Sequence, residues 1–498
     1  MGASTPPPRM LKRAVLGASA SAASSVAQLA VQILAIAVIS RLLSPAEFGL
    51  VAPMIALSTL IATIAEGGFG ASIINAGDDF DQVRDVVLTG LIGTSVVGVV
   101  LFQVALTLAP GLLNFDDAKM AALVLSSIVI LVPFSSYLEC HLLRNLNFGR
   151  VSSIDFVAVF LGVLVGPLAL AFAGFGVWSL IWGPVIRYFV KTVLYIIYAG
   201  ARFRPNLSGA GLFRILEFSG YMSAAKVSAL IALQGDRVVM AGTLPPATLG
   251  AYARAQNLIQ ISLDSTTAAM DRVLFPVFAR SDKLQLARRY HFVLAVVSAL
   301  TLPMVVVVVH ASDFLVRLLL GPQWNFAVVF AQLLAPLIFF RAVDRSSAAI
   351  LRRGSWIKFR AFTQFIVAAL TIFCAVALVK IDMRLYISSV VVIAFVNLIV
   401  NQIIVARAIG STFVDGFKSF RAGTITGVIT VFCFLCFGAR EELSMRLPAL
   451  AAGVASGAVV LGSLMLFWPQ VIFGKVDGAR IREIRDGVLI RFGVRKHD

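Results

Sequence analysis

The sequence predicts an all-α, polytopic membrane protein with about 14 transmembrane helices. Three observations support this fold class: 59% of the 498 residues are hydrophobic, only 13% are charged, and the mean hydropathy is +0.93. Soluble globular chains are roughly half apolar and about a quarter charged. The composition therefore excludes a cytosolic enzyme, a secreted domain and a disordered protein. Because each span with its loop takes roughly 30–40 residues, the length leaves no room for a large water-soluble domain.

Windows of roughly 20 mainly apolar residues define the elements in chain order. The first six helices are predicted at Ala14–Ile39, Ala46–Ala65, Val86–Leu108, Met120–Leu138, Ile154–Phe172 and Gly176–Ala199. The next six are predicted at Tyr221–Ala241, Leu249–Val277, Tyr290–Val309, Phe326–Val343, Ala361–Val379 and Leu385–Val405, and the last two at Gly423–Phe437 and Leu447–Trp468. The first helix follows a basic start but is too long for the apolar core of a cleaved signal peptide.

Two polar breaks divide these helices into groups of six, six and two. The predicted domains are a cytoplasmic N-terminal tail (1–13), an N-lobe of six helices (14–199), a cytoplasmic inter-lobe linker (200–220), a C-lobe of six helices (221–405), a linker with the last two helices (406–468) and a basic cytoplasmic tail (469–498).

The basic residues predict the orientation of the chain. There are 42 Lys+Arg against 25 Asp+Glu, a balance that would suggest nucleic-acid binding in a soluble protein. In a membrane protein, Lys and Arg concentrate in the cytoplasmic loops. With a cytoplasmic N-terminus, most basic loop residues fall on the cytoplasmic side, so we expect both termini there. The tail after Trp468 either lies on anionic lipid or serves only to set the topology.

The motifs that carry enzyme chemistry are weak here. Cys433 and Cys436 have a redox or metal-binding spacing, but they lie in an apolar helix without a second pair. Asp79 and Asp81 have the spacing of a glycosyltransferase metal site, but that chemistry needs a folded nucleotide-sugar domain. The connections between helices are also too short for an ATP-hydrolysing domain. We therefore expect a transporter without a cofactor or a metal site, and not an enzyme.

Polar residues recur on one side of three predicted helices. The eighth helix carries Asn257, Gln260, Asp264, Thr267 and Asp271 at helical spacing. The seventh carries Lys226, Gln234, Asp236 and Arg237, and the first carries Ser21, Ser25, Gln28 and Gln32. A charge at mid-bilayer costs at least about 2.5–3.5 kcal/mol, so such residues usually face a bundle interior or a wet cavity. These stripes predict a solvated path between two lobes.

Further cations in the membrane zone are Arg187 and Lys191 in the sixth helix and Arg341 in the tenth. Two interpretations of the neighbouring opposite charges stay open, because Asp236 with Arg237, and Asp271 with Arg272, could equally be structural ion pairs. Lys226 has no acidic neighbour in sequence. It either snorkels to the cytoplasmic face or faces the cavity, which is the interpretation that we prefer.

Four sequence blocks are distinctive. They are SRLLSPAEFGLVAPMIALSTLIATIAEGGFGASIIN (Ser40–Asn75), LLRNLNFGRVSSIDF with GFGVWSLIWGPVIR (Leu142–Arg187), QGDRVVMAGTLPPATLGAYARAQNLIQISLDSTTAAMDRVLFPVFAR (Gln234–Arg280) and FLVRLLLGPQWNFAVVFAQLLA (Phe314–Ala335). In this order and spacing they resemble the polysaccharide-export flippases of the MOP superfamily, which translocate repeat units of lipopolysaccharide or exopolysaccharide.

The resemblance implies a flippase that exports lipid-linked (polyprenyl-diphosphate) oligosaccharide repeat units across the inner membrane by alternating access of two six-helix lobes. Because cavities in the family are commonly cationic, the substrate-binding candidates are Arg187, Lys191, Lys226, Arg237, Arg254, Arg272 and Arg341, together with Asn257, Gln260, Gln28 and Gln32. Candidates for coupling to Na⁺ or H⁺ are Asp236, Asp264 and Asp271. The expected partners are the lipid-linked oligosaccharide, membrane lipids, and a glycan polymerase with its export machinery, but no nucleic acid.

Two other functions stay open. Multidrug or peptidoglycan-precursor transport uses the same architecture, although cationic drugs would need an acidic, aromatic cavity and cations are at least as numerous here. A membrane-embedded glycan polymerase or ligase would carry a large periplasmic loop with catalytic Arg or His. The predicted outside loops are short, which argues against this second class.

Overall fold

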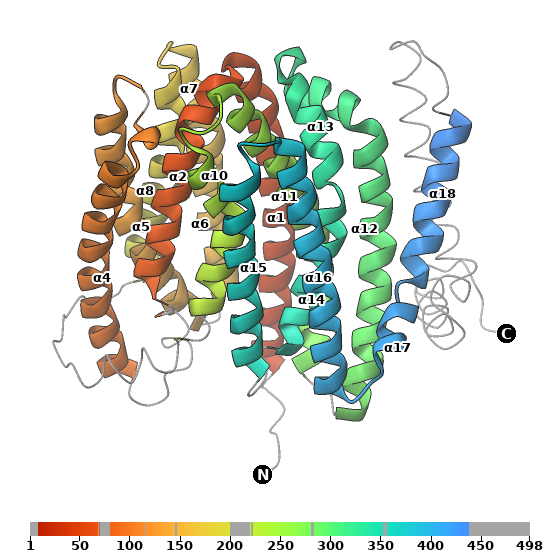
Figure 1. Cartoon of the computed structure of the whole chain (residues 1–498). Helices are drawn as coiled ribbons and strands as arrows, with labels where there is room; N and C mark the ends of the chain where they lie inside the picture. The colour runs from red at the N-terminus through yellow and green to blue at the C-terminus, as the bar shows by residue number, and fades with distance from the viewer. Residues whose placement is uncertain are drawn as a thin grey trace, which may run out of the picture. The chain divides into compact units, whose positions relative to one another are not determined.

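The computed structural model describes residues 8–67, 69, 80–113, 115–144, 147–199, 220, 223–279, 283–351 and 356–437, without the side chains of 8–22, 80–82, 265–279, 283–285 and 433–437. These residues form helices joined by short connections, with no strand among them (Figure 1). Within this part of the chain, nine helices are long and apolar enough to cross a membrane, or ten if a bent pair counts as one span. The predicted all-α membrane fold is confirmed, while the orientation of the termini stays a prediction.

The helices follow the predicted order. The earlier ones are α1 (Pro8–Leu42), α2 (Pro45–Glu66), α4 (Phe80–Leu108), η1 (Pro110–Leu112), α5 (Ala118–Arg144), α6 (Phe148–Val159), η2 (Phe160–Val165), α7 (Gly166–Phe172) and α8 (Val177–Ala199). After a helical segment at 223–230 come η3 (Ile231–Gly235), α10 (Asp236–Met240), α11 (Pro246–Ala279), α12 (Lys283–Leu319), η4 (Pro322–Trp324), α13 (Asn325–Leu334), α14 (Pro336–Leu351), α15 (Trp356–Leu378), α16 (Met383–Ile409), α17 (Phe413–Lys418) and α18 (Arg421–Phe437).

The chain divides into two compact units. The first comprises Met1–Arg254, Arg317–Ala327 and Ile357–Val390, and the second comprises Ala255–Val316, Val328–Trp356 and Val391–Asp498. This division by contacts cuts through several helices, so the start of α11 belongs to the first unit and the rest of α11 to the second. The lobes predicted at 14–199 and 221–405 follow the chain order instead, and they stay a prediction.

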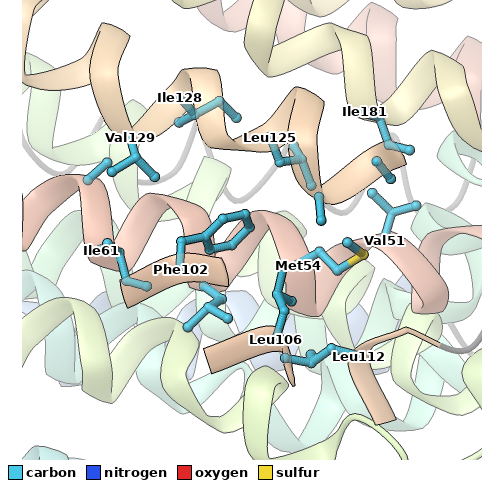
Figure 2. Packing of buried hydrophobic residues seen from close by; sticks show 14 of the residues in the cluster. Val51, Met54, Ile61, Phe102, Leu106, Leu112, Leu125, Ile128, Val129 and Ile181 are labelled. Carbon is cyan, nitrogen blue, oxygen red and sulfur yellow. The ribbon is translucent and has the colours of Figure 1, made fainter. Parts of the chain in front are cut away.

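In the first unit, α2, α4, α5 and α8 pack around an apolar core. Figure 2 shows Met54 of α2, Phe102 of α4 and Leu125 of α5 gathered in this core, and all three are fully buried. Lipid tails are as apolar as these side chains, so helix association depends on close packing and on hydrogen bonds between helices. One such bond runs from Thr94 Oγ1 of α4 to the carbonyl oxygen of Ala65 in α2, at 2.7 Å.

The start of α2 is determined by its local sequence. Ser44 and Glu47 form a capping box, in which the Ser44 hydroxyl accepts the Glu47 N–H and the Glu47 carboxylate accepts the Ser44 N–H. Pro45 occupies the first turn, where its missing N–H is not needed. The helix therefore begins at a fixed point, which places Gly49 in its second turn.

In the second unit, α12, α14 and α16 pack around Leu294, Val343 and Leu398. A buried polar network joins the same helices. Tyr290 Oη lies 2.9 Å from Ser347 Oγ, and Gln402 Nε2 donates to Ser347 Oγ at 3.2 Å. A satisfied network of this kind favours one arrangement of the three helices.

The structure differs from the sequence analysis mainly at helix ends. The predicted span Phe326–Val343 is two helices, α13 and α14, bent by 49°, because Pro336 lacks the N–H that would continue α13. Other helices, α5 among them, extend beyond their apolar windows. The predicted helix Leu447–Trp468, the tail 469–498, residues 1–7 and the linker 200–220, apart from residue 220, lie outside the described residues.

Candidate functional site

Lys226, near the start of the predicted seventh helix, pairs with Glu66 at the end of α2. Its Nζ lies 2.6 Å from Glu66 Oε2, and Ser136 Oγ of α5 donates to the other carboxylate oxygen at 2.7 Å. The Lys226 side chain is 57% exposed, whereas that of Glu66 is 13% exposed. The counter-ion that Lys226 lacks in its own sequence neighbourhood thus comes from α2. The result is an accessible cation beside a largely buried carboxylate.

Lys191 is held between two carboxylates inside the first unit. Its Nζ lies 2.9 Å from Glu139 Oε2 of α5 and 3.0 Å from Asp155 Oδ1 of α6. Tyr195 Oη of α8 donates to the same Asp155 oxygen at 3.3 Å. The Lys191 side chain is only 15% exposed. This geometry favours a cation that joins α5, α6 and α8 over one that is open to a substrate.

Asp236 is a buried hydrogen-bond acceptor at the start of α10. Its Oδ2 accepts the hydroxyls of Tyr252 on α11 and Tyr386 on α16, and its Oδ1 accepts the backbone N–H of Arg237 at 2.8 Å. Asp236 is 1% exposed, and both tyrosines are fully buried. These hydrogen bonds satisfy much of the acceptor capacity of the carboxylate. In this structure, the predicted coupling candidate is closed off from solvent.

The starts of α2 and α11 cross at two glycines. Both begin with a similar segment, PAEFG from Pro45 to Gly49 and PATLG from Pro246 to Gly250. A Cβ atom on Gly49 would overlap the carbonyl oxygen of Pro246, and one on Gly250 would overlap that of Pro45. Only glycine allows two backbones to come this close. We call this contact the α2–α11 crossing, and it lies wholly within the first unit.

Arg254 is a buried cation beside the crossing. Its Cζ lies 3.7 Å from the centroid of the Phe48 ring, the residue is 8% exposed, and its Nε has no hydrogen-bond partner among the described residues. Phe48 also packs edge-on against Trp324, whose indole N–H donates to the carbonyl oxygen of Ser40 at 2.9 Å. Three of the four distinctive sequence blocks therefore meet here.

In the second unit, the polar stripe of α11 meets α14. Arg345 Nη2 lies 2.8 Å from Asp264 Oδ1, and Gln260 Nε2 donates to the same oxygen at 3.0 Å. The side chains of Arg345 and Asp264 are 41% and 50% exposed. Asn257 is half-buried on α11, and Arg341 is half-buried on α14. The structure thus brings two predicted residues of the stripe together with Arg345, which is not among the predicted site residues.

The remaining candidates have other contacts. Arg187 is half-buried on α8, with its guanidinium carbon 5.7 Å from the centroid of the Tyr188 ring. On α1, Gln28 donates to the Ser24 hydroxyl at 3.1 Å, and Gln32 is half-buried.

Two further predicted residues, Asp271 and Arg272, lie on α11, but their side chains are outside the described part. The side chains of Cys433 and Cys436 are outside it as well. Among the residues that are described, no group of three or more His, Cys, Asp or Glu could hold a metal ion.

Sequence reasoning missed three charged residues of these clusters, which are Glu139, Asp155 and Arg345. Glu139 and Arg345 lie just beyond predicted spans, because the predicted spans end where the apolar residues stop. The helices themselves continue, as α5 to Arg144 and α14 to Leu351. The sequence does indicate these extensions, because no Gly or Pro, the residues that usually end a helix, interrupts either of them.

Comparison with known proteins agrees with this fold and its sequence blocks. A family model described as "Polysaccharide biosynthesis protein" matches residues 38–329. The chain is 26% identical over 463 residues to the succinoglycan biosynthesis transport protein ExoT of Rhizobium meliloti, covering 90% of this chain and 92% of that protein. It is 23% identical over 367 residues to the lipopolysaccharide biosynthesis protein WzxC of Escherichia coli, covering 71% of this chain and 74% of that protein.

Solved structures show the same architecture. The lipid II flippase MurJ, in an inward closed conformation, matches with a TM-score of 0.70 at 12% identity over 89% of this chain and 98% of that chain. An inward-facing MATE multidrug transporter of the MOP superfamily matches with a TM-score of 0.55 at 14% identity over 81% of this chain and 96% of that chain. These likenesses confirm the predicted transporter fold.

Proposed function

Because the chain belongs to the family of polysaccharide biosynthesis proteins, we propose that it is a flippase for lipid-linked (polyprenyl-diphosphate) oligosaccharide repeat units in the bacterial inner membrane. The family match over residues 38–329 carries this proposal. Curated relatives are named for lipopolysaccharide, succinoglycan and teichuronic acid, and one is named a transport protein. These names support transport of a glycan class over an enzymatic reaction. They do not single out one sugar.

The proposed substrate presents a physical problem that the charged residues could solve. A diphosphate with a hydrophilic glycan cannot cross hydrocarbon unaided, while its polyprenyl tail can stay in the lipid. Lys226 in the first unit and Arg345 in the second are both accessible cations on helices, with side chains 57% and 41% exposed. Ammonium and guanidinium groups form strong, charge-assisted hydrogen bonds to phosphate oxygens. Both residues are therefore candidates for contact with the diphosphate.

The α2–α11 crossing is the part of the molecule that we assign to gating. In the predicted topology, α2 and α11 both start on the outer side of the membrane, so the crossing would close the outer end of the path. Export by alternating access requires this end to open. Contacts between backbones at glycines can separate without unpacking a large apolar core, which suits a seal that must open in each cycle.

The membrane potential is one source of energy for this export. With the cell interior negative, outward movement of an anion gains about 2.3 kcal/mol per charge per 100 mV across the whole field. Coupling to Na⁺ or H⁺ through Asp236, Asp264 or Asp271 would add a second source. If one ion is coupled, collapse of its gradient alone should lower flux in vesicles at constant potential. Flux that is unchanged after each gradient is collapsed in turn would leave the potential as the driving force.

The proposed function is tested by deletion of the gene. We expect loss of the surface glycan and accumulation of lipid-linked repeat units in the cytoplasmic leaflet, with both restored by the full-length chain. A glycan polymerase and export machinery are the expected partners downstream. Normal surface glycan in the deletion strain, or accumulation of a peptidoglycan precursor in place of the repeat unit, would contradict the proposal.

Lys226→Ala should lower export about tenfold or more, because a hydrogen bond to a charged group contributes about 1.5–3 kcal/mol. The measurement is surface glycan per molecule of flippase in the membrane, and Lys226→Arg should retain part of the activity. Lys418→Ala is the matched control, because Lys418 is a 73% exposed lysine on α17, paired with Asp415 at 3.5 Å. Arg237→Ala tests the other cation of the predicted stripe in the same assay. Normal surface glycan from both alanine variants would contradict the assignment of these two cations to the substrate-binding site.

A further inference from the structure

We propose that Arg345 binds the diphosphate of the substrate by exchanging partners, with Asp264 as the carboxylate that the diphosphate displaces. The proposal rests on the proposed function and deepens it, because it assigns the anion-binding role to an arginine outside the predicted stripe. It also gives Asp264 a role other than ion coupling, as the group that competes with the substrate and helps to release it.

The Arg345–Asp264 pair is accessible although it joins two helices of the membrane domain. Its charged atoms lie 2.8 Å apart, and the two side chains are 41% and 50% exposed. Asp264 lies in the interior of the 34-residue helix α11, and α14 belongs to the bent candidate span. Charged groups exposed at such positions face water and not acyl chains, because burial in hydrocarbon is costly. An anion in a water-filled path can therefore reach Arg345.

The fold of the second unit does not depend on this pair. α14 is attached to α16 by Asp344, whose carboxylate accepts Asn397 Nδ2 at 3.2 Å and Asn401 Nδ2 at 2.8 Å. The fully buried Ser347 joins α14 to α12. An exposed ion pair contributes only about 0–1 kcal/mol to stability. Arg345 can therefore exchange partners without loosening the packing of α14.

The surrounding groups fit an exchange. The planar guanidinium presents a fork of donors that matches a phosphate group, and a diphosphate carries more negative charge than the single carboxylate it replaces. Gln260 Nε2 already donates to Asp264 Oδ1 at 3.0 Å, so the displaced carboxylate keeps one hydrogen bond. Return of Asp264 to Arg345 then favours release of the diphosphate. The spacing of Arg341, one turn before Arg345 on α14, places a second cation on the same side of the helix.

The test measures binding of farnesyl diphosphate to the purified full-length chain in nanodiscs, with farnesyl monophosphate as the weaker comparison ligand. Asp264→Asn removes the competitor, so its Kd should fall about two- to fivefold below that of the wild type. Arg345→Gln should raise Kd about tenfold or more. In the double variant Asp264→Asn/Arg345→Gln, the gain in affinity should be absent, and Kd should match that of Arg345→Gln.

Asp415→Asn is the control for removal of a negative charge, because Asp415 is a 46% exposed carboxylate in the first turn of the short helix α17, in the same unit. The Kd of this variant should equal that of the wild type. If Arg345→Gln does not reach the membrane, Arg345→Lys keeps the charge without the fork and should weaken binding by a smaller factor. The exchange is overturned if Asp264→Asn binds farnesyl diphosphate no more tightly than the wild type. It is also overturned if Asp264→Asn lowers Kd by the same factor in the Arg345→Gln background. Absence of binding by the wild type would instead contradict the proposed function.

Discussion

Gly250→Ala should reduce export about fivefold or more, because the added Cβ destabilises the α2–α11 crossing. A Cβ at position 250 overlaps the carbonyl oxygen of Pro45, a backbone atom inside another helix, so the two helices must separate. Overpacking of this kind costs about 1–3 kcal/mol, which shifts the equilibrium between the closed and open forms of the crossing about 5- to 150-fold. Gly49→Ala should act in the same way from the opposite side, since its Cβ overlaps the Pro246 carbonyl oxygen. Surface glycan per molecule of flippase measures the loss.

A second readout separates gating from misfolding. A cysteine at Ala247, in a chain whose four native cysteines are replaced, should react faster with a membrane-impermeant thiol reagent when Gly250→Ala is present. Gly93→Ala is the matched control on α4, because a Cβ there meets nothing within 4 Å. Normal export together with unchanged labelling in Gly250→Ala would show that the crossing is not a gate.

Lys191→Ala should destabilise the protein by about 3–5 kcal/mol, because it leaves two largely buried carboxylates without their cation. Glu139 and Asp155 are each 28% exposed and would face one another across the vacated position. We therefore expect a lower melting temperature and less folded protein in the membrane. Adding Glu139→Gln and Asp155→Asn to this variant should recover much of the lost stability, since the uncompensated charges are then removed.

The outcome also decides between two roles for Lys191. The sequence makes it a candidate for the substrate cavity, whereas its contacts favour a structural role. Lys418→Ala is again the control, because its exposed pair should contribute no more than about 1 kcal/mol. A Lys191→Ala chain that melts normally but exports no glycan would support the cavity role and contradict the structural one.

The spans could be predicted well because a helix in lipid must satisfy its backbone groups internally and present apolar side chains outward. Both requirements are local, so α2 and α8 differ from their predicted bounds by one residue at most at each end. The ends are less predictable where a helix continues into charged residues. Glu139 on α5 and Arg345 on α14 resemble loop residues in sequence. Hydropathy indicates whether a residue lies in lipid or in water, but not whether its backbone is helical.

From the residues alone it follows that the chain is a multi-pass helical membrane protein and that several helices carry polar stripes, because hydropathy and helical periodicity are properties of neighbouring residues. The pairing of the charges cannot be predicted in this way. Lys226 pairs with Glu66, 160 residues away in the sequence, and Arg345 pairs with Asp264, 81 residues away. Lys191 is paired in a largely buried site, whereas Arg345 is paired at an accessible one. This difference depends on which helices pack together, and neighbouring residues in the sequence do not determine it.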